Sequence, residues 1–161
     1  MTYPLTRRSL FAACGGGAAA LMLGGAAFAA APKFEVAMSP AEWRKKLGPE
    51  RYAVLREAAT ERPGSSALLN EHRKGVFACA GCGLPTFSSD TKFESGTGWP
   101  SFFRALPHAI VTRSDHSLGM SRTETLCRRC GGHLGHLFDD GPRPTGLRYC
   151  MNGLALTFRP A

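Results

Sequence analysis

The sequence predicts an antiparallel β domain that two short helices lead into, and three observations support this prediction. From Gly75 onward, short apolar runs are interrupted every several residues by Gly, Pro, Asp or Ser, a pattern typical of short strands joined by turns. The 161 residues include 19 Gly and 11 Pro, which disfavours long helices. The length, with 43% hydrophobic and 20% charged residues, fits one globular domain.

The two helices are expected just before this β region. Ser39 can cap a helix that begins at Pro40, and Glu42 is placed to return the capping hydrogen bond. This helix should end near Gly48, and a second helix is expected over residues 49–60, where apolar residues recur at helical spacing.

Five segments of the later region are expected to be strands. Each is a short run rich in apolar, β-branched or aromatic residues. They are residues 75–78, 86–87, 109–112, 123–126 and 154–158. Leu134, Leu137 and Phe138 are expected to join the same sheet structure.

The first 30 residues are typical of an export signal. Arg7 and Arg8 form a twin-arginine sequence, no charged residue follows as far as Pro32, and Ala27-Phe28-Ala29 offers a small-residue cleavage site. We therefore expect residues 1–30 to be a Tat-type signal peptide, handled by the Tat translocase, and residues 31–161 to be a periplasmic domain. The alternative is an uncut signal that anchors the protein, since the stretch is long enough to span a membrane.

The net charge argues against a nucleic-acid partner. Loss of residues 1–30 removes two arginines and no acid, which lowers the formal charge from +8 to +6. The remaining basic residues are scattered along the chain, whereas nucleic-acid binding needs them clustered on one face.

Four cysteines form two C-x-x-C turns, Cys79/Cys82 and Cys127/Cys130, separated by 44 residues. Two such turns can complete a tetrahedral shell of four sulfurs around one structural Zn²⁺, with no position left for water or substrate. Disulfides, common in exported proteins, and a thioredoxin-type redox pair are the alternatives. Neither pair lies in a βαβ pattern, and a protein exported in folded form can take up zinc beforehand, so we expect one zinc per chain and no organic cofactor.

The fifth cysteine of the mature chain, Cys150, stands alone. A lone cysteine among apolar residues is often a buried structural thiol. If this segment is a strand, however, Arg148 lies on the same face and can stabilise a thiolate. His133 and His136 offer proton donors, although they could also be metal ligands, and the Asp139–Asp140 pair can orient an imidazole. These groups outline a nucleophilic site.

Six segments occur in order along residues 39–159: Gly98–Phe102, Leu118–Glu124, His133–Phe138, Asp140–Pro142, Pro144–Gly146 and Arg148–Asn152. Together they resemble the B-type methionine sulfoxide reductases, which are selective for the R epimer at sulfur. The resemblance implies a mainly β fold with two antiparallel sheets in a small barrel-like or tent-like domain, with a zinc held by four cysteines in many members.

The resemblance also implies the chemistry. The Cys150 thiolate would attack the sulfoxide sulfur while His133 and His136 hold and protonate the oxygen, leaving methionine and a cysteine sulfenic acid. The ring of Trp99 would pack against the S-methyl group of the substrate. The positions assigned to substrate binding are Trp99 and Phe102, and those assigned to support of the site are Asn152, Arg148 and Asp140.

The chain departs from many family members at Thr97, where they carry a resolving cysteine. If the paired cysteines hold zinc, no free thiol remains for an intramolecular disulfide. We therefore expect a one-cysteine cycle, in which an external thiol reductant of thioredoxin-like type regenerates Cys150. Gly153 stands where many members have Ser, and we expect little effect from that difference.

Two other classes of protein stay open. One is a zinc-knuckle module that binds nucleic acid or protein and whose lone cysteine is structural. The other is a zinc enzyme of related fold that acts on another small molecule, which the Trp99 and Arg148–Asn152 segments disfavour. The leading interpretation is a monomeric reductase that repairs oxidised methionine in proteins, and Cys150→Ser separates it from the binding module.

Overall fold

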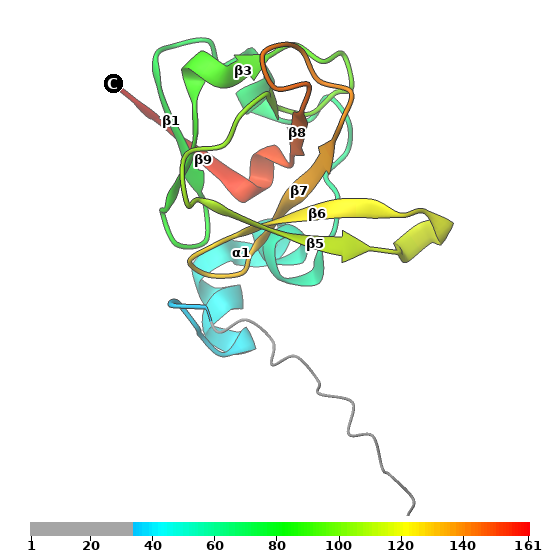
Figure 1. Ribbon diagram of the computed structural model, residues 1–161. Helices are drawn as coiled ribbons and strands as arrows, with labels where there is room; N and C mark the ends of the chain where they lie inside the picture. Colours follow the sequence, from blue (N-terminus) through cyan, green and yellow to red (C-terminus); the bar gives the residue numbers. More distant parts are fainter. Residues whose placement is uncertain (1–33) are drawn as a thin grey trace, which may run out of the picture. The chain divides into compact units, whose positions relative to one another are not determined.

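The computed structural model describes residues 34–161, which form a β domain with one long helix (Figure 1). The expected signal peptide at residues 1–30 lies outside the described residues. Two antiparallel sheets make up the domain, which confirms the predicted fold class. In the described part, no helix has the length and apolar character needed to cross a membrane.

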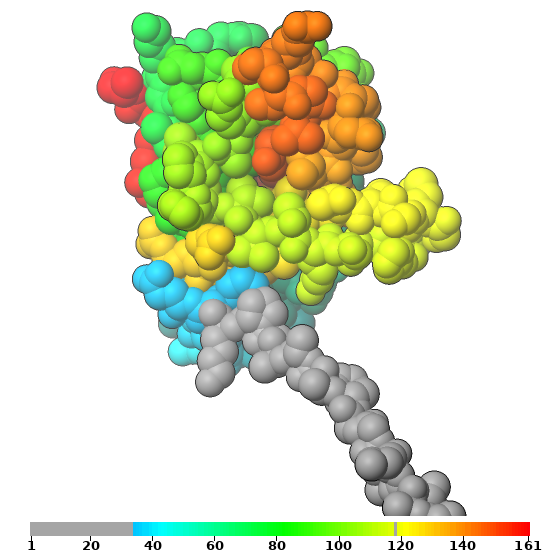
Figure 2. All heavy atoms as spheres, in the orientation of Figure 1, coloured from blue at the N-terminus to red at the C-terminus, as the bar shows by residue number. Residues whose placement is uncertain are grey.

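The smaller sheet has three strands in the order β2 (Pro85–Ser88), β1 (Gly75–Cys79) and β9 (Leu156–Pro160). The larger sheet has six, in the order β3 (Lys92–Phe93), β4 (Ser101–Phe102), β8 (Arg148–Met151), β7 (His133–Phe138), β6 (Arg122–Cys127) and β5 (Ile110–Asp115). Short 3₁₀ turns connect some of them: η1 (Ala67–Asn70), η2 (Ser89–Thr91), η3 (Ser117–Gly119) and η4 (Gly153–Ala155). The β5–β6 hairpin extends to one side, and its tip stands out from the surface (Figures 1 and 2).

The helix α1 (Pro40–Glu57) begins and breaks where the sequence predicts. The Ser39 hydroxyl accepts from the Glu42 backbone N–H, and the Glu42 carboxylate accepts from the Ser39 N–H at 2.7 Å, which completes the capping box. Gly48 (φ 71°, ψ 173°) interrupts the helical geometry, so α1 consists of the two expected helical segments. The second segment ends three residues earlier than expected, because Ala58 turns into the left-handed conformation at φ 55°.

All five expected strand segments contain strands, and Leu134, Leu137 and Phe138 lie in β7 as expected. Several boundaries move: residues 154–155 belong to η4 and β9 begins at Leu156, while β5 begins at Ile110 and continues to Asp115. Strands β3 and β4 were not predicted, and β8 was predicted only conditionally, for the segment that carries Cys150. The first two have only two residues each, too few for an alternating pattern to be read from the sequence.

Aromatic side chains join the two sheets. Phe102 of β4 stacks on Phe87 of β2 with ring centroids 4.3 Å apart, and it contacts Phe77 of β1 edge-on at 4.9 Å. All three rings are fully buried. Burying side chains of this size contributes roughly 2–3 kcal/mol each, so this cluster fixes the smaller sheet against the end of the larger one.

Candidate active site

The site is built on one row of residues across the larger sheet. Ser101, Cys150, His136, Glu124 and Arg113 lie directly opposite one another on β4, β8, β7, β6 and β5. Residues that oppose each other on neighbouring strands point to the same face of a sheet. A hydroxyl, a thiol, an imidazole, a carboxylate and a guanidinium are therefore brought onto one face by strand pairing alone.

A β-bulge adds the second histidine to this face. Residues 125–126 of β6 oppose Gly135 and His133 of β7, so Leu134 is an extra residue without a partner. In a regular strand, His133 and His136 would point to opposite faces because they are three residues apart. Because the bulge adds one residue, both histidines point to the same face, and their ring centroids lie 5.4 Å apart.

Gly135 allows β7 to approach β8 at the bulge. Its φ of +155° lies in a region that residues other than glycine rarely adopt. A Cβ atom at this position would collide with the carbonyl oxygen of Cys150 and would come within 2.9 Å of Met151 Cα. The glycine is therefore needed for the histidines and the thiol to share one face at this spacing.

His133 is held by a buried carboxylate. Its Nδ1 lies 2.7 Å from Glu124 Oε1, and Arg113 Nε donates to the other carboxylate oxygen at 2.8 Å. Burial lowers the pKa of His133, and the hydrogen bond and charge of Glu124 oppose this effect. With Nδ1–H donated to Glu124, Nε2 is buried and has no hydrogen-bond partner among the described residues. Such an atom is unusual in a native protein and is available to a ligand.

His136 is held by a second carboxylate, which comes from the β5–β6 hairpin. Its Nε2 lies 2.8 Å from Asp115 Oδ2, and Arg122 Nη2 donates to the same oxygen at 2.7 Å. Hydrogen bonds from Ser117, His136 and Arg122 hold the pKa of Asp115 well below its ordinary value. Asp115 therefore stays ionised and fixes the imidazole of His136.

The Asp139–Asp140 pair, expected to orient an imidazole, does not hold either histidine. Asp140 does not contact an imidazole; it accepts two hydrogen bonds from Arg148, from Nε and Nη2, at 2.8 Å each. Glu124 and Asp115 are the carboxylates that contact the histidines. The alternation of side chains along β6 would have placed Glu124 on the face that carries the site. No local sequence pattern indicates that Asp115 contacts His136.

Cys150 is half-buried and lies on the same face of β8 as Arg148, as expected for a strand. Burial raises the pKa of the Cys150 thiol. The Thr97 hydroxyl, 3.8 Å from the sulfur, and the Arg148 guanidinium lower it, with a smaller combined effect. Arg148 therefore acts in the predicted direction, and burial acts against it.

Cys150 opens into a small pocket of about 110 Å³. Its other lining residues are Thr60, Trp99, Arg122, Gly135, His136, Phe138 and Asn152. Trp99 is fixed by a hydrogen bond of 3.1 Å from Nε1 to the carbonyl oxygen of Glu61. A pocket with two aromatic walls, a thiol and an imidazole suits a small thioether-like group with one polar atom.

Phe102 lies away from this pocket, contrary to its assignment to substrate binding. Ser101 opposes Cys150 and shares its face, so the next residue along the strand points to the other side, into the core with Phe87. Phe138 supplies the second aromatic wall instead, and the Arg148 guanidinium covers its ring at 4.3 Å.

Glu61 was not predicted, yet it joins three parts of the site. Its backbone N–H donates to Asn152 Oδ1 at 3.0 Å, and its carbonyl oxygen accepts from Trp99. Its buried carboxylate accepts from the backbone N–H of Gly153 at 2.5 Å and of Leu154 at 2.9 Å, at the start of η4. Trp99 is 38 residues away in sequence and the other partners are 91 to 93 residues away, so no local pattern could reveal them.

Replacing Glu61 by Ala is expected to lower the free energy of unfolding by about 3 kcal/mol, because two backbone donors lose their acceptor, at roughly 1–3 kcal/mol each. Urea denaturation followed by circular dichroism measures this difference. Glu61→Gln keeps one acceptor oxygen and should lose clearly less. Equal stability of the Ala variant and the wild type would contradict the assigned role.

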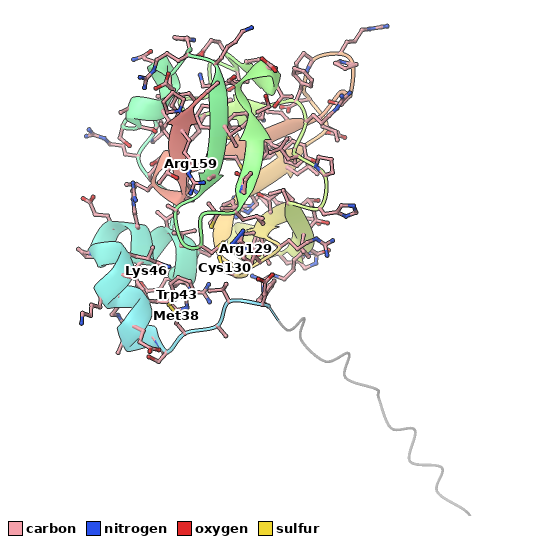
Figure 3. The ribbon with its side chains drawn as sticks, turned by 90° about the vertical axis from the view of Figure 1, so that its left-hand side faces the viewer. Met38, Trp43, Lys46, Arg129, Cys130 and Arg159 are labelled. Atoms are coloured by element: carbon pink, nitrogen blue, oxygen red, sulfur yellow. The ribbon has the colours of Figure 1, made fainter. Side chains whose placement is uncertain are left out.

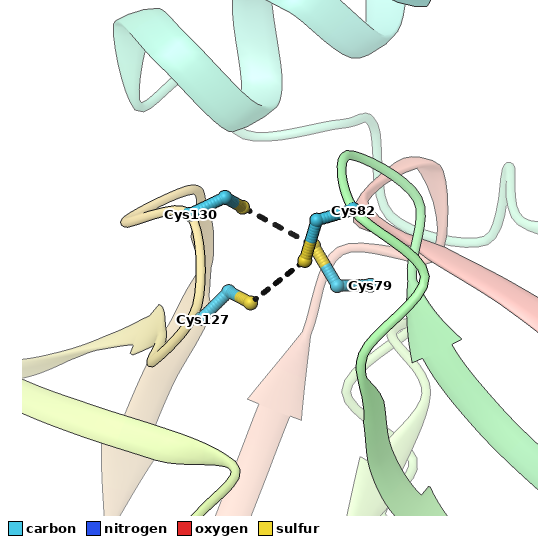
Figure 4. Close-up of side chains that lie close together, drawn as sticks. All are labelled: Cys79, Cys82, Cys127 and Cys130. Carbon is cyan, nitrogen blue, oxygen red and sulfur yellow. Dashed lines mark hydrogen bonds between the residues drawn. The ribbon is translucent and has the colours of Figure 1, made fainter. Parts of the chain in front are cut away.

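The paired cysteines come together as one cluster. All four sulfur atoms lie within 4.8 Å of one another, with 3.7 Å between those of Cys79 and Cys130 and 3.5 Å between those of Cys82 and Cys127 (Figure 4). Sulfurs bound tetrahedrally at ~2.3 Å to one Zn²⁺ lie about 3.8 Å apart. The cluster therefore fits a metal ion, and all five cysteines of the described part are free rather than disulfide-bonded.

Helix α1 covers this cluster. Trp43 is buried beside it, and Arg56 donates from Nη1 to the carbonyl oxygen of Cys130 at 2.9 Å (Figure 3 labels Trp43 and Cys130). Three of the four cysteines are buried, and Cys82 is partly exposed. The contact from Arg56 ties the second C-x-x-C turn to the helix. None of the four cysteines lines the pocket beside Cys150.

The fold and the site together define a class of protein: a β domain with a four-cysteine cluster that fits a metal ion. Its half-buried thiol shares one sheet face with two carboxylate-held imidazoles, the arrangement of a thiol-based enzyme.

Comparison with known proteins gives the family. The SelR domain family matches residues 47–160. The chain is 53% identical over 127 residues to the peptide methionine sulfoxide reductase MsrB of Leptospira interrogans, which covers 78% of this chain and 97% of that protein. It is 53% identical to the protein of that name from Leifsonia xyli (80% and 94% covered) and 52% identical to that from Agrobacterium fabrum (78% and 94%). The chain belongs to the SelR domain family of MsrB proteins.

Proposed function

We propose that this protein reduces the R epimer of methionine sulfoxide in oxidised proteins to methionine, with Cys150 as the nucleophile. The observation that carries the proposal is the row in which the Cys150 thiol and the His136 imidazole oppose each other on one face, beside a pocket walled by Trp99 and Phe138. Relatives named peptide methionine sulfoxide reductase, at about half identity over nearly their whole length, support it.

The reaction balances with one thiol. The sulfur of Cys150 attacks the sulfoxide sulfur, the S–O bond breaks, and the oxygen ends on Cys150 as a sulfenic acid. The thiol loses two electrons, the sulfoxide gains them, and the proton of the thiol is retained in the S–OH group. The thioether of methionine leaves.

In this reaction the histidines bind and protonate the oxygen of the sulfoxide. Negative charge builds on the sulfoxide oxygen as the S–O bond weakens, so a preorganised donor there stabilises the transition state most. His136 lines the pocket, and the ring of His133, whose Nε2 is unpartnered among the described residues, lies 5.4 Å from that of His136. Each imidazole is fixed by its carboxylate. A protonated imidazole at this position can deliver a proton to the departing oxygen.

Separate assays of the two sulfoxide epimers test the proposal. A methionine sulfoxide peptide of defined configuration at sulfur is incubated with the purified protein and dithiothreitol. We expect turnover of the R epimer alone. Absence of turnover with either epimer, in folded protein that retains its metal, would exclude this activity and favour the binding-module alternative.

The metal of the four-cysteine cluster is proposed to be one Zn²⁺ per chain. Four cysteine ligands at this spacing are typical of closed structural zinc sites. When bound, the zinc would hold the two C-x-x-C turns together and supply no reactive position. The chain's own contribution is the fixed placement of α1 over those turns.

The regeneration step is proposed to use an external thiol, because Thr97 offers no sulfur beside Cys150 and the remaining cysteines of the described part form the metal cluster. A thiol of a thioredoxin-like donor would attack the sulfenic sulfur, release water, and resolve the mixed disulfide with a second thiol.

One turnover without reductant is therefore expected to leave Cys150 as a sulfenic acid that a dimedone probe captures, with no intramolecular disulfide. Mass spectrometry of the digested protein reads both products. Thr97→Cys is the matched comparison: its sulfur would lie close to Cys150, where Thr97 Oγ1 is now 3.8 Å away, so this variant should form the disulfide instead. A disulfide that involves Cys150 in the unaltered protein would contradict the one-cysteine cycle.

Export is the last part of the proposal. The twin-arginine sequence and the small-residue site at Ala27–Ala29 support passage through the Tat translocase and cleavage near residue 30. The exported enzyme would act, as a monomer, on oxidised envelope proteins. A retained membrane anchor is the alternative. Replacement of Arg7 and Arg8 by Lys should leave the protein in the cytoplasm, which cell fractionation shows, and an unchanged distribution would argue against the Tat route.

A further inference from the structure

Three hydroxyl side chains beside Cys150 form a hydrogen-bonded chain that the reaction above does not use. Thr97 Oγ1 lies 3.8 Å from Cys150 Sγ and 2.8 Å from Ser95 Oγ. Ser95 Oγ lies 2.7 Å from Ser101 Oγ, which donates to the carbonyl oxygen of Trp99 at 3.1 Å. Ser101 is fully buried and opposes Cys150 across the sheet. The chain therefore runs from the reacting sulfur to a fixed backbone acceptor.

Such a chain can point in two directions, because each hydroxyl donates once and also accepts. When Ser101 donates to the backbone, Ser95 donates to Ser101 and Thr97 to Ser95. The oxygen of Thr97 then accepts the S–H of the resting thiol. When all three O–H groups rotate, Ser101 donates to Ser95, Ser95 to Thr97, and Thr97 to the sulfur.

We propose that Thr97 is a catalytic residue that donates a hydrogen bond to the Cys150 thiolate as it forms, and that Ser95 and Ser101 are positioning residues that orient the Thr97 hydroxyl. The inference rests on the nucleophilic role of Cys150 in the proposed function. A hydrogen bond to an ionised acceptor is roughly twice as strong as a neutral one, so reversal of the chain favours the attacking form. Burial raises the pKa of the Cys150 thiol, and a hydrogen bond donated by Thr97 acts against this rise.

Four charged or titratable groups also face the sulfur or its pocket. Arg148, on the same strand, lowers the pKa of the Cys150 thiol, and Asp140, which holds Arg148, raises it. His136 of β7 and Arg122 of β6 line the same pocket. Substitutions within the hydroxyl chain leave these four groups in place, so a changed titration of Cys150 reports on the hydroxyls.

The test is the pH dependence of Cys150 alkylation by iodoacetamide in the purified, metal-loaded protein. The rate is read by mass spectrometry on the peptide that contains Cys150, between about pH 6 and 11, a range that spans the ordinary cysteine pKa. For Thr97→Val, which keeps the shape and removes the hydroxyl, we expect the midpoint to rise by about one pH unit. Alkylation at pH 8 should be about tenfold slower, the scale of one hydrogen bond to a charged group.

Two further variants separate the hydroxyl from mere packing. Thr97→Ser keeps the hydroxyl and should restore the midpoint, whereas Ser95→Ala leaves Thr97 without its orienting partner and should give a smaller rise. For reduction of the R sulfoxide, kcat is expected to fall most in Thr97→Val, less in Ser95→Ala and least in Thr97→Ser, with KM little changed. The alkylation readout needs no sulfoxide, so it stays informative even if the proposed substrate is wrong.

The proposal is overturned if the midpoint is unchanged in Ser95→Ala and in Thr97→Val, or if Thr97→Ser behaves like Thr97→Val. Thermal unfolding and metal content identify a variant that fails to fold. If Thr97→Val does so, Ser95→Ala with an unchanged midpoint is sufficient to reject the hydroxyl chain.

Discussion

Replacement of Cys150 by Ser is expected to abolish reduction of the R sulfoxide, with kcat lowered about 10⁴-fold or more, the scale seen when an enzyme loses its nucleophile. A serine hydroxyl does not ionise in this pocket and cannot carry the oxygen as a sulfenic acid. The two residues that oppose position 150 on the neighbouring strands, His136 and Ser101, stay in place. Release of methionine from the sulfoxide peptide, measured by chromatography, checks the result.

The Cys150→Ser variant should keep its fold and its metal. The side chain is half-buried, the change in size is small, and the four-cysteine cluster lies elsewhere. Unfolding temperature and metal content are therefore the controls. Appreciable turnover in this variant would mean that another group attacks the sulfoxide, and intact binding of a protein or nucleic acid without any turnover in the wild type would favour a binding module.

Replacement of Cys127 by Ser is expected to damage the whole domain instead. Cys127 is fully buried, and its sulfur lies 3.5 Å from that of Cys82. A structural zinc contributes a folding free energy of about 10 kcal/mol or more, which is comparable to the roughly 5–15 kcal/mol total stability of a domain. The variant should bind less than about half a zinc per chain and either fail to fold or melt at least roughly 15 °C lower.

Elemental analysis and thermal unfolding followed by circular dichroism test this prediction, with Cys150→Ser as the matched cysteine control. Removal of the metal from the wild type with a strong chelator should reproduce the loss of stability. A Cys127→Ser protein that contains no zinc and melts like the wild type would show that the cluster is not a structural metal site.

The features that could be predicted from sequence are those whose determinants lie close together along the chain. The capping box needs only Ser39 and Glu42, three residues apart, and it forms as expected. Each C-x-x-C turn carries its own geometry, so the cluster of four sulfurs was predictable even though its halves are 44 residues apart. The alternating strands around the core followed from the same kind of local pattern.

The rest of the site depends on which strands lie next to one another. Asp115 reaches His136 across 21 residues, and Glu61 reaches Gly153 across 92. No local pattern encodes such contacts, because they form only when hairpin and loop are folded against the sheet. The error at Phe102 has the same origin: the resemblance assigned it to substrate binding together with Trp99, whereas strand register turns its ring into the core.

The bulge at Leu134 makes the number of residues between the two histidines part of the enzyme's chemistry. In a regular strand this three-residue spacing would carry one imidazole to the far side of the sheet, whereas removal of Leu134 would leave the histidines two residues apart, a spacing at which a regular strand keeps both on one face. The spacing between His133 and His136 and the presence of the bulge therefore have to match for both imidazoles to share the sheet face that carries the thiol.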